Sequence, residues 1–249
     1  MTLRWYGEGN DSVTLEQIRQ IPGVAGVITA LHDIPAGEAW TYEDVMKRKQ
    51  EVEAKGLKLC GVESINVHED IKIGLPTRDK LIEDYCKSLE AVGKAGIHLV
   101  CYNFMPVFDW TRTDLAMPLE DGSTALAYDS SIIDGIDASE MFDRIEKASG
   151  GFVMPGWEPN RRDEIMDLFD KYKDVTADKL RENFKYFLDG IMPTCEKYQI
   201  KMAVHPDDPA LDVFGLPRIV TCEDDLLKIA SLNSSIYNGF TFCTGSLGS

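Results

Sequence analysis

The chain has 249 residues, of which 44% are hydrophobic and 27% are charged, and it carries a formal net charge of −16 at pH 7. This balance is typical of a globular protein with one large core. No apolar run reaches the roughly 18 residues that a membrane-spanning helix needs. The excess of 42 acidic over 26 basic residues leaves no basic patch for phosphate backbones. We therefore expect neither a membrane nor nucleic acid as a partner.

The beginning of the chain and its cysteines both indicate a reducing compartment. The first seven residues lack the basic region and the apolar stretch of a secretory signal peptide. The six cysteines are scattered, with no closely spaced pair, which is unlike a disulfide framework. We expect a cytoplasmic protein in which most of these thiols are buried as small hydrophobic groups.

A unit of helix, glycine and strand recurs along the chain. Gly56 precedes the apolar stretch 57–62, and Gly96 precedes the apolar stretch 97–102. A glycine just past a helix can adopt the left-handed conformation that ends the helix. A third instance carries Gln199 at the position where the glycine would stand. The repetition predicts several helix-to-strand connections of the same kind.

Two of the segments that precede these strands have the period of an amphipathic helix. The residues that share an apolar face are Leu81, Ile82, Tyr85, Leu89 and Val92 in the first, and Leu180, Phe184, Phe187, Leu188 and Ile191 in the second. Strands that alternate with helices of this length indicate βαβ units. The sequence therefore predicts an α/β fold with a parallel sheet.

Six strands can be placed along the chain. Their approximate ranges are 3–6, 24–31, 57–63, 97–103, 200–204 and 239–243. A TIM (β/α)8 barrel has eight, and each βα unit takes about 30 residues or more. We expect one barrel domain over residues 1–249 that holds only about six βα units, and hence the leading part of a longer protein.

A long excursion at about 105–175 follows the fourth predicted strand. It is rich in proline and glycine, and short helices are predicted near 137–148 and 161–172. A long insertion at the carboxyl end of a barrel strand is often the cover of an active site. An oligomer contact or a surface decoration explains such an insertion equally well.

Two potential metal ligands follow consecutive predicted strands. His205 comes directly after the fifth strand, and Cys243 ends the sixth. Active sites of barrel enzymes gather at the carboxyl ends of the strands, so both side chains are expected to face the same opening. By ligand type alone, imidazole and thiolate favour Zn²⁺ or Fe²⁺ over Mn²⁺. Two ligands are too few for a site, and a structural role for His205 is the alternative.

The loop after His205 can contribute a further interaction. It reads His205-Pro206-Asp207-Asp208-Pro209, and either aspartate could orient the imidazole by a hydrogen bond.

Five further side chains are candidates for substrate binding, namely Trp5, Glu63, Asn103, Trp110 and Arg112. Trp5, Glu63 and Asn103 lie at or next to predicted strand ends, and Trp110 and Arg112 lie on the excursion, where Arg112 could meet a substrate carboxylate. Each has a structural alternative, which is barrel packing for Trp5, a helix cap or ion pair for Glu63, a turn for Asn103 and solvation for Arg112. Three other histidines show no pattern of partners: His32, His68 and His98.

Several segments carry a resemblance to a known family. They are 4–7 (Arg-Trp-Tyr-Gly), 67–72, 102–112, 205–209, 215–219 and 238–243. In this order along the whole chain they resemble the corresponding segments of mannonate dehydratases. A small departure is Ala210, where members of the family often carry a second proline.

The resemblance implies a xylose-isomerase-like TIM barrel that dehydrates D-mannonate to 2-keto-3-deoxy-D-gluconate in hexuronate (glucuronate) catabolism. It implies Mn²⁺ or Fe²⁺ as the cofactor, because His205 and Cys243 match two metal-ligand positions of the family. The other ligands, a His and an Asp, and the catalytic residues are expected beyond Ser249. We expect the protein to be a homo-oligomer, a dimer.

Two other functions remain open at this point. Another metal-dependent barrel of the xylose-isomerase type, a sugar epimerase or isomerase, would carry a carboxylate-rich metal site in place of Cys243. A non-catalytic barrel fragment, retained for binding or assembly, is an alternative of a different class.

Overall fold

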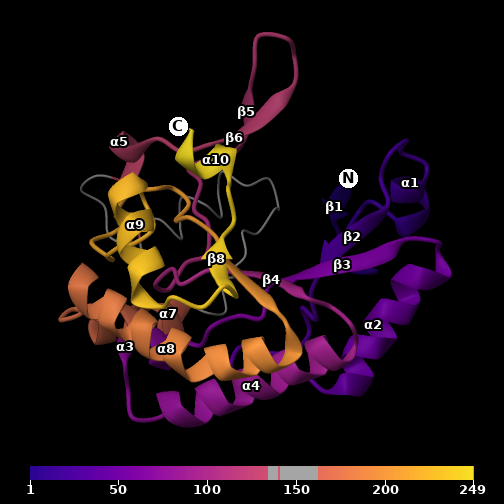
Figure 1. Cartoon of the computed structure of the whole chain (residues 1–249). Helices are drawn as coiled ribbons and strands as arrows, with labels where there is room; N and C mark the ends of the chain where they lie inside the picture. Colours follow the sequence, from indigo (N-terminus) through magenta and orange to yellow (C-terminus); the bar gives the residue numbers. More distant parts are fainter. Residues whose placement is uncertain (134–139, 141–161, 249) are drawn as a thin grey trace. The chain divides into compact units, whose positions relative to one another are not determined.

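The structure is a computed structural model that describes residues 1–133, 140 and 162–248 (Figure 1). Its contacts divide the chain into two compact units. The sheet unit comprises Met1–Phe104, Asn183–His205 and Lys228–Phe242, and the excursion unit comprises Met105–Glu182, Pro206–Leu227 and Cys243–Ser249. We describe each unit by itself, and the expectation of a single domain over 1–249 stays a prediction.

The sheet unit contains a six-stranded parallel sheet in the order β1-β2-β3-β4-β7-β8. The strands are β1 (Thr2–Arg4), β2 (Gly26–Thr29), β3 (Lys58–Glu63), β4 (Leu99–Tyr102), β7 (Lys201–Val204) and β8 (Asn238–Phe240). All six predicted strands are present, although most are shorter than predicted. Each strand of this sheet pairs with the strand of the sheet that follows it along the chain, as in a (β/α)8 barrel. Among the described residues no ladder joins β1 to β8, so this sheet is open.

Helices connect the strands of the sheet. They are α1 (Leu15–Arg19), α2 (Tyr42–Ala54), α3 (Glu69–Ile73), α4 (Arg78–Lys94), α8 (Ala177–Tyr198) and α9 (Glu223–Leu232). Local capping explains several of their starts: Thr14 and Gln17 form a capping box at α1, and the Thr41 hydroxyl accepts the Asp44 N–H at α2. Figure 1 shows α2, α4 and the later part of α8 along one side of the strands.

The predicted left-handed connections are confirmed. Gly56 and Gly96 have φ angles of 75° and 77°, two residues before β3 and three residues before β4. Gln199 adopts the same conformation, with φ of 55°, before β7. The shared geometry turns each chain segment from the end of a helix into the next strand. The absence of a glycine at the third connection therefore does not change the backbone path.

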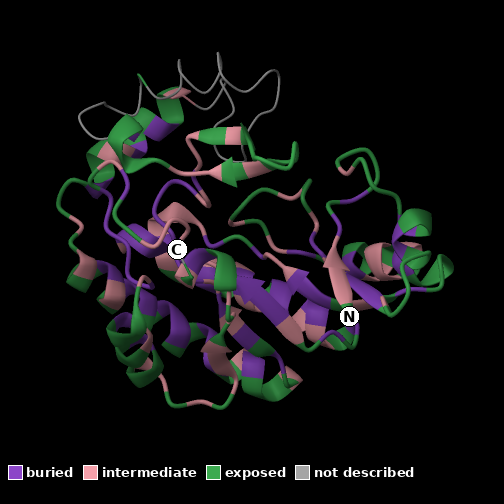
Figure 2. Ribbon diagram, turned by 90° about the horizontal axis from the view of Figure 1, so that it is seen from above, coloured by how far each residue is buried: buried purple, intermediate pink, exposed green. Residues whose placement is uncertain are grey.

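The predicted helix faces form the core. Ile82, Tyr85, Leu89 and Val92 of α4 are buried, whereas Leu81 is only partly buried, and all five predicted residues of α8 have no exposed surface. Within the sheet unit an aromatic cluster forms around α8, whose members are Tyr85, Tyr102, Phe104, Phe184 and Phe187. Figure 2 shows the strands mainly in the colour of buried residues, with exposed residues on the outer sides of the helices.

The excursion unit has its own secondary structure, with helices α5 (Ser130–Ile133), α7 (Arg162–Tyr172) and α10 (Thr244–Leu247) and strands β5 (Asp114–Pro118) and β6 (Thr124–Ala127). Helix α7 confirms the helix predicted near 161–172. The helix predicted near 137–148 lies outside the described residues apart from Glu140.

The antiparallel hairpin of β5 and β6 was not predicted. The Asp121-Gly122 pair between the strands is the signal that could have found it, because Gly122 has φ of 84° in the turn. Among the described residues, no helix combines the length and the apolar character that crossing a membrane requires.

Candidate active site

The two predicted metal ligands follow the paired ends of β7 and β8. Val204 and Phe240 are Cα partners in this ladder. His205 is the next residue after Val204, and its N–H donates to the Tyr102 carbonyl at 2.7 Å, which anchors its backbone beside β4. The prediction that Cys243 ends the sixth strand is wrong, because β8 ends at Phe240 and Cys243 lies three residues later, directly before α10. Along the chain, His205 thus follows the end of β7 by one residue, and Cys243 follows the end of β8 by three residues.

The Cys243 thiol is partly buried and accepts a hydrogen bond from the Ser246 hydroxyl at 3.4 Å. This hydrogen bond orients the side chain of Cys243, as bonds to the outer atoms of metal ligands commonly do. Within the ranges that the structure describes, no three His, Cys, Asp or Glu side chains form a cluster that could hold a metal ion. His205 belongs to the sheet unit and Cys243 to the excursion unit, so their joint coordination of a metal stays a prediction.

The aspartates after His205 have other partners. Oδ2 of Asp207 accepts the backbone N–H groups of Ile219 and Val220 at 2.8 and 2.7 Å, and Oδ1 lies 3.5 Å from the Arg218 guanidinium. Burial raises the pKa of the Asp207 carboxyl, whereas Arg218 and the two N–H groups oppose that rise. These bonds tie the 205–209 loop to residues 218–220. Two of the segments that carry the family resemblance, 205–209 and 215–219, are therefore in contact.

Arg112 is held by the same loop. Its Nη2 donates to Oδ2 of Asp208 at 2.9 Å and its Nη1 to the Thr111 carbonyl at 2.8 Å. The guanidinium carbon lies 5.5 Å from the ring centroid of Trp110. The structure therefore brings Arg112 and Trp110 together. Their predicted roles toward a substrate stay predictions, because Arg112 already has a carboxylate partner.

Trp5 lies on the helix side of the sheet. It is 3% exposed and packs in a core cluster with residues of α1 and α2; the indole N–H donates to the Val13 carbonyl at 3.2 Å. Barrel packing, the alternative given for Trp5, thus accounts for its position. A role in substrate binding stays a prediction.

Arg4, the residue before Trp5, points to the opposite side, because successive side chains of a strand alternate between faces. Its Nη1 lies 2.6 Å from Oε1 of Glu63, the last residue of β3. The ion pair spans β2, which lies between β1 and β3. Glu63 is thus at a strand end, as predicted, and its partner Arg4 is an unexpected finding.

Tyr6 and His32 extend this group. The Arg4 guanidinium carbon lies 4.7 Å from the centroid of the Tyr6 ring, and Tyr6 stacks on the His32 imidazole with centroids 5.6 Å apart and an interplanar angle of 29°. Desolvation by burial lowers the pKa of His32, and the positive charges of Arg4 and Arg48 lower it further. No local sequence pattern indicates this partner of His32, because the contact joins loops that follow different strands.

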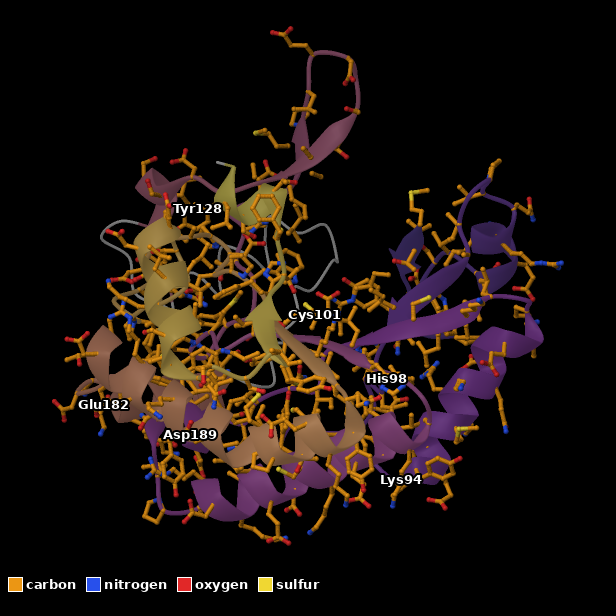
Figure 3. All side chains as sticks on the ribbon, viewed as in Figure 1. Lys94, His98, Cys101, Tyr128, Glu182 and Asp189 are labelled. Atoms are coloured by element: carbon orange, nitrogen blue, oxygen red, sulfur yellow. The ribbon has the colours of Figure 1, made fainter. Side chains whose placement is uncertain are left out.

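The candidate Asn103 and the histidine His98 lie at opposite ends of β4. Asn103 follows the last residue of β4 and is partly buried. His98 precedes β4 at the opposite end, where its Nδ1 lies 3.2 Å from the Tyr198 carbonyl (Figure 3). Cys101, inside β4, lies with its sulfur 3.1 Å from the Thr241 hydroxyl. His98 is thus a structural residue at the amino end of the sheet.

The parallel sheet, with polar side chains at the carboxyl ends of its strands, defines an α/β protein built like the TIM-barrel enzymes. The model of the D-mannonate dehydratase (UxuA) family matches residues 1–249. The chain belongs to this family, and the resemblance inferred from its motifs is confirmed.

The relatives support the same conclusion. The chain is 61% identical over 249 residues to a mannonate dehydratase of Brachyspira hyodysenteriae and 54% identical over 248 residues to one of Thermotoga maritima. It covers 70% and 69% of their lengths, respectively. The crystal structure of mannonate dehydratase from Streptococcus suis matches with 45% identity and a TM-score of 0.88, over 100% of this chain and 65% of that one.

Proposed function

We propose that the protein dehydrates D-mannonate to 2-keto-3-deoxy-D-gluconate. The observation that carries this proposal is the 61% identity to a curated mannonate dehydratase over all 249 residues. An activity transfers more safely at this identity than by fold alone, since one barrel fold supports many reactions. We further infer a role in glucuronate catabolism, in the cytoplasm, as a homodimer.

We propose His205 and Cys243 as two ligands of Mn²⁺ or Fe²⁺, together with the further His and Asp that the family resemblance implies. Two observations support the fit: the backbone of His205 is anchored to β4, and the Cys243 sulfur already accepts a hydrogen bond. Imidazole and thiolate are suitable donors for a borderline divalent ion. A divalent cation, when bound, stabilises the negative charge that develops on the substrate carboxylate as carbon 2 loses its proton.

The reaction also needs two proton transfers. A base takes the proton from carbon 2, and an acid protonates the hydroxyl that leaves carbon 3. We assign neither role to a described residue. The contribution proposed for this chain is to hold the metal and to bind the substrate.

The test is to incubate the full-length, Mn²⁺-loaded protein with D-mannonate and, separately, with its stereoisomer D-altronate. We expect D-mannonate to lose one water and yield 2-keto-3-deoxy-D-gluconate, seen by mass spectrometry, and D-altronate to remain intact. Turnover of neither acid, or preference for D-altronate, would contradict the proposal. Exchange of the carbon 2 proton in D₂O without loss of water would instead indicate an epimerase.

A further inference from the structure

Arg4, Tyr6, His32 and Glu63 form a group in which only Glu63 has been considered so far, as a candidate for substrate binding. We call it the β1–β3 cluster, because Arg4 ends β1 and Glu63 ends β3, while Tyr6 and His32 follow β1 and β2. All four residues belong to the sheet unit, so their contacts lie within one compact body. The ion pair of 2.6 Å and the two ring contacts connect them in one chain of interactions.

The β1–β3 cluster lies at the end of the sheet where barrel enzymes bind their substrates. Trp5 fills the helix side with its indole, so the alternation of side chains directs Arg4 to the other face. Arg4 and Glu63 then meet across β2 at the carboxyl ends of the strands. In the fold of this family that face becomes the inside of the barrel, and its carboxyl end becomes the mouth.

The chemistry of the β1–β3 cluster suits hydroxyl groups better than a carboxylate. Glu63 neutralises the charge of Arg4, so the pair has no net charge to offer an anion. The side chains of Arg4 and Glu63 are 32% and 27% exposed, and Nε of Arg4 is a buried donor with no hydrogen-bond partner in the described structure. A lowered pKa keeps His32 neutral, with one ring donor and one ring acceptor. Such a set of donors and acceptors matches hydroxyls, which both donate and accept.

The order of the strands separates the β1–β3 cluster from His205. β7, which leads into His205, is the fifth strand in the order and β1 is the first. In an eight-stranded barrel the first and fifth strands lie on opposite sides of the mouth. An acyclic six-carbon acid with its carboxylate end near His205 therefore extends its other end toward β1.

We propose that Arg4, Tyr6, His32 and Glu63 form a polyol subsite that binds the hydroxyl-bearing tail, carbons 4 to 6, of the sugar acid. This inference rests on the proposed function. The subsite orients the substrate by its non-reacting end, and it favours six-carbon acids over shorter ones.

The test compares Glu63→Gln with the wild type in the full-length, metal-loaded protein. Two readouts separate the ends of the substrate: the KM for D-mannonate, and the inhibition constant of L-erythronate, which keeps the configuration of carbons 2 and 3 but lacks carbons 5 and 6. We expect the KM to rise about tenfold, as for the loss of a hydrogen bond to a charged group. The kcat, the metal content and the inhibition constant of L-erythronate should stay within twofold.

Asp84→Asn is the matched control. Asp84 also pairs with cations at 2.8 and 2.9 Å and is 18% exposed, but it lies on α4. Its KM and inhibition constant should equal those of the wild type. An unchanged KM in Glu63→Gln would overturn the inference, and so would an equal rise of the KM and the inhibition constant, which would place Glu63 at the reacting end or in a purely structural role.

A failure of the proposed function is recognised separately, by the absence of D-mannonate turnover in the wild type. Calorimetric titration with D-mannitol, an uncharged polyol, then tests the subsite alone. Weaker binding by Glu63→Gln than by the wild type would support the subsite. Equal affinities, or no binding by either protein, would overturn it.

Discussion

The Arg218 guanidinium and the Asp207 carboxylate form an ion pair inside the excursion unit, with Nη1 and Oδ1 3.5 Å apart and side chains 0% and 3% exposed. Both Nη atoms of Arg218 also donate to the Phe108 carbonyl at 3.3 Å. The pair thus joins the loop after His205 and the segment around Arg218 to Phe108, which lies 110 residues before Arg218. Because the pair is buried, the conformation of the loop after His205 depends on the Asp207 carboxylate.

Replacement of Asp207 by Asn should therefore destabilise the protein strongly. The change leaves the Arg218 cation buried without its counter-charge, a situation that typically costs about 3–5 kcal/mol. Urea unfolding, followed by circular dichroism, measures the loss. As a control, Asp170→Asn removes an ion pair with Lys173 in which both side chains are 70% exposed, and it should not change the midpoint. If Asp207→Asn unfolds at the same urea concentration as the wild type, the structural role of the pair is refuted.

The left-handed residues before β4 and β7 predict opposite effects of substitution. Gly96→Ala should lower the unfolding free energy by about 1–2 kcal/mol, the cost of a left-handed residue with a Cβ, because the nearest atom to that Cβ, Nζ of Lys49, is at 3.8 Å and no clash adds to it. Gln199→Gly should instead raise it by up to about 1 kcal/mol, since glycine removes the strain. Thermal unfolding of both variants decides the matter. If the two substitutions change the unfolding free energy in the same direction, backbone strain does not dominate at these positions.

Removal of Arg4 should raise the pKa of His32. Desolvation is the largest cause of the lowered pKa, and the charges of Arg4 and Arg48 follow. In Arg4→Met the second cause is lost, so NMR titration of the imidazole should show a midpoint closer to the ordinary value of about 6.5. Asp84→Asn should leave the titration unchanged. A midpoint that does not move in Arg4→Met would show that Arg4 does not act on His32.

The same shift predicts how His32 affects stability. A histidine with a lowered native pKa contributes stability that is fully present above its unfolded pKa and is lost as the pH falls through the native pKa. The unfolding free energy of the wild type, compared with that of His32→Gln, should therefore decrease on acidification below about pH 6.5. A difference that grows on acidification would contradict the assigned direction.

Cys243→Ala should abolish metal retention with little effect on the fold. The thiol is partly buried, and in the described part of the chain it accepts a hydrogen bond from Ser246, so the loss of packing is small. Metal content after dialysis, measured by mass spectrometry, is the readout, and dehydratase activity should fall in parallel. Cys222→Ala, which removes an exposed thiol, is the control. Full metal content in Cys243→Ala would rule out the proposed ligand.

The sequence by itself determined the parallel α/β fold, the positions of the six strands and the apolar faces of α4 and α8. These features depend on local patterns: the period of apolar residues sets the helix face, and a residue that ends a helix sets the next strand. The same local information placed His205 and Glu63 at strand ends. The Asp121-Gly122 pair between β5 and β6 is a local signal of the same kind, because glycine permits the left-handed turn of a hairpin.

Only the tertiary structure decided which side chains meet. Arg4 and Glu63 are far apart in the sequence and come together because β2 lies between their strands in register. Trp5 and Arg4 differ in their surroundings only because one strand face packs on helices and the other does not. Such contacts depend on the pairing and facing of distant segments, which local patterns along a single chain do not encode.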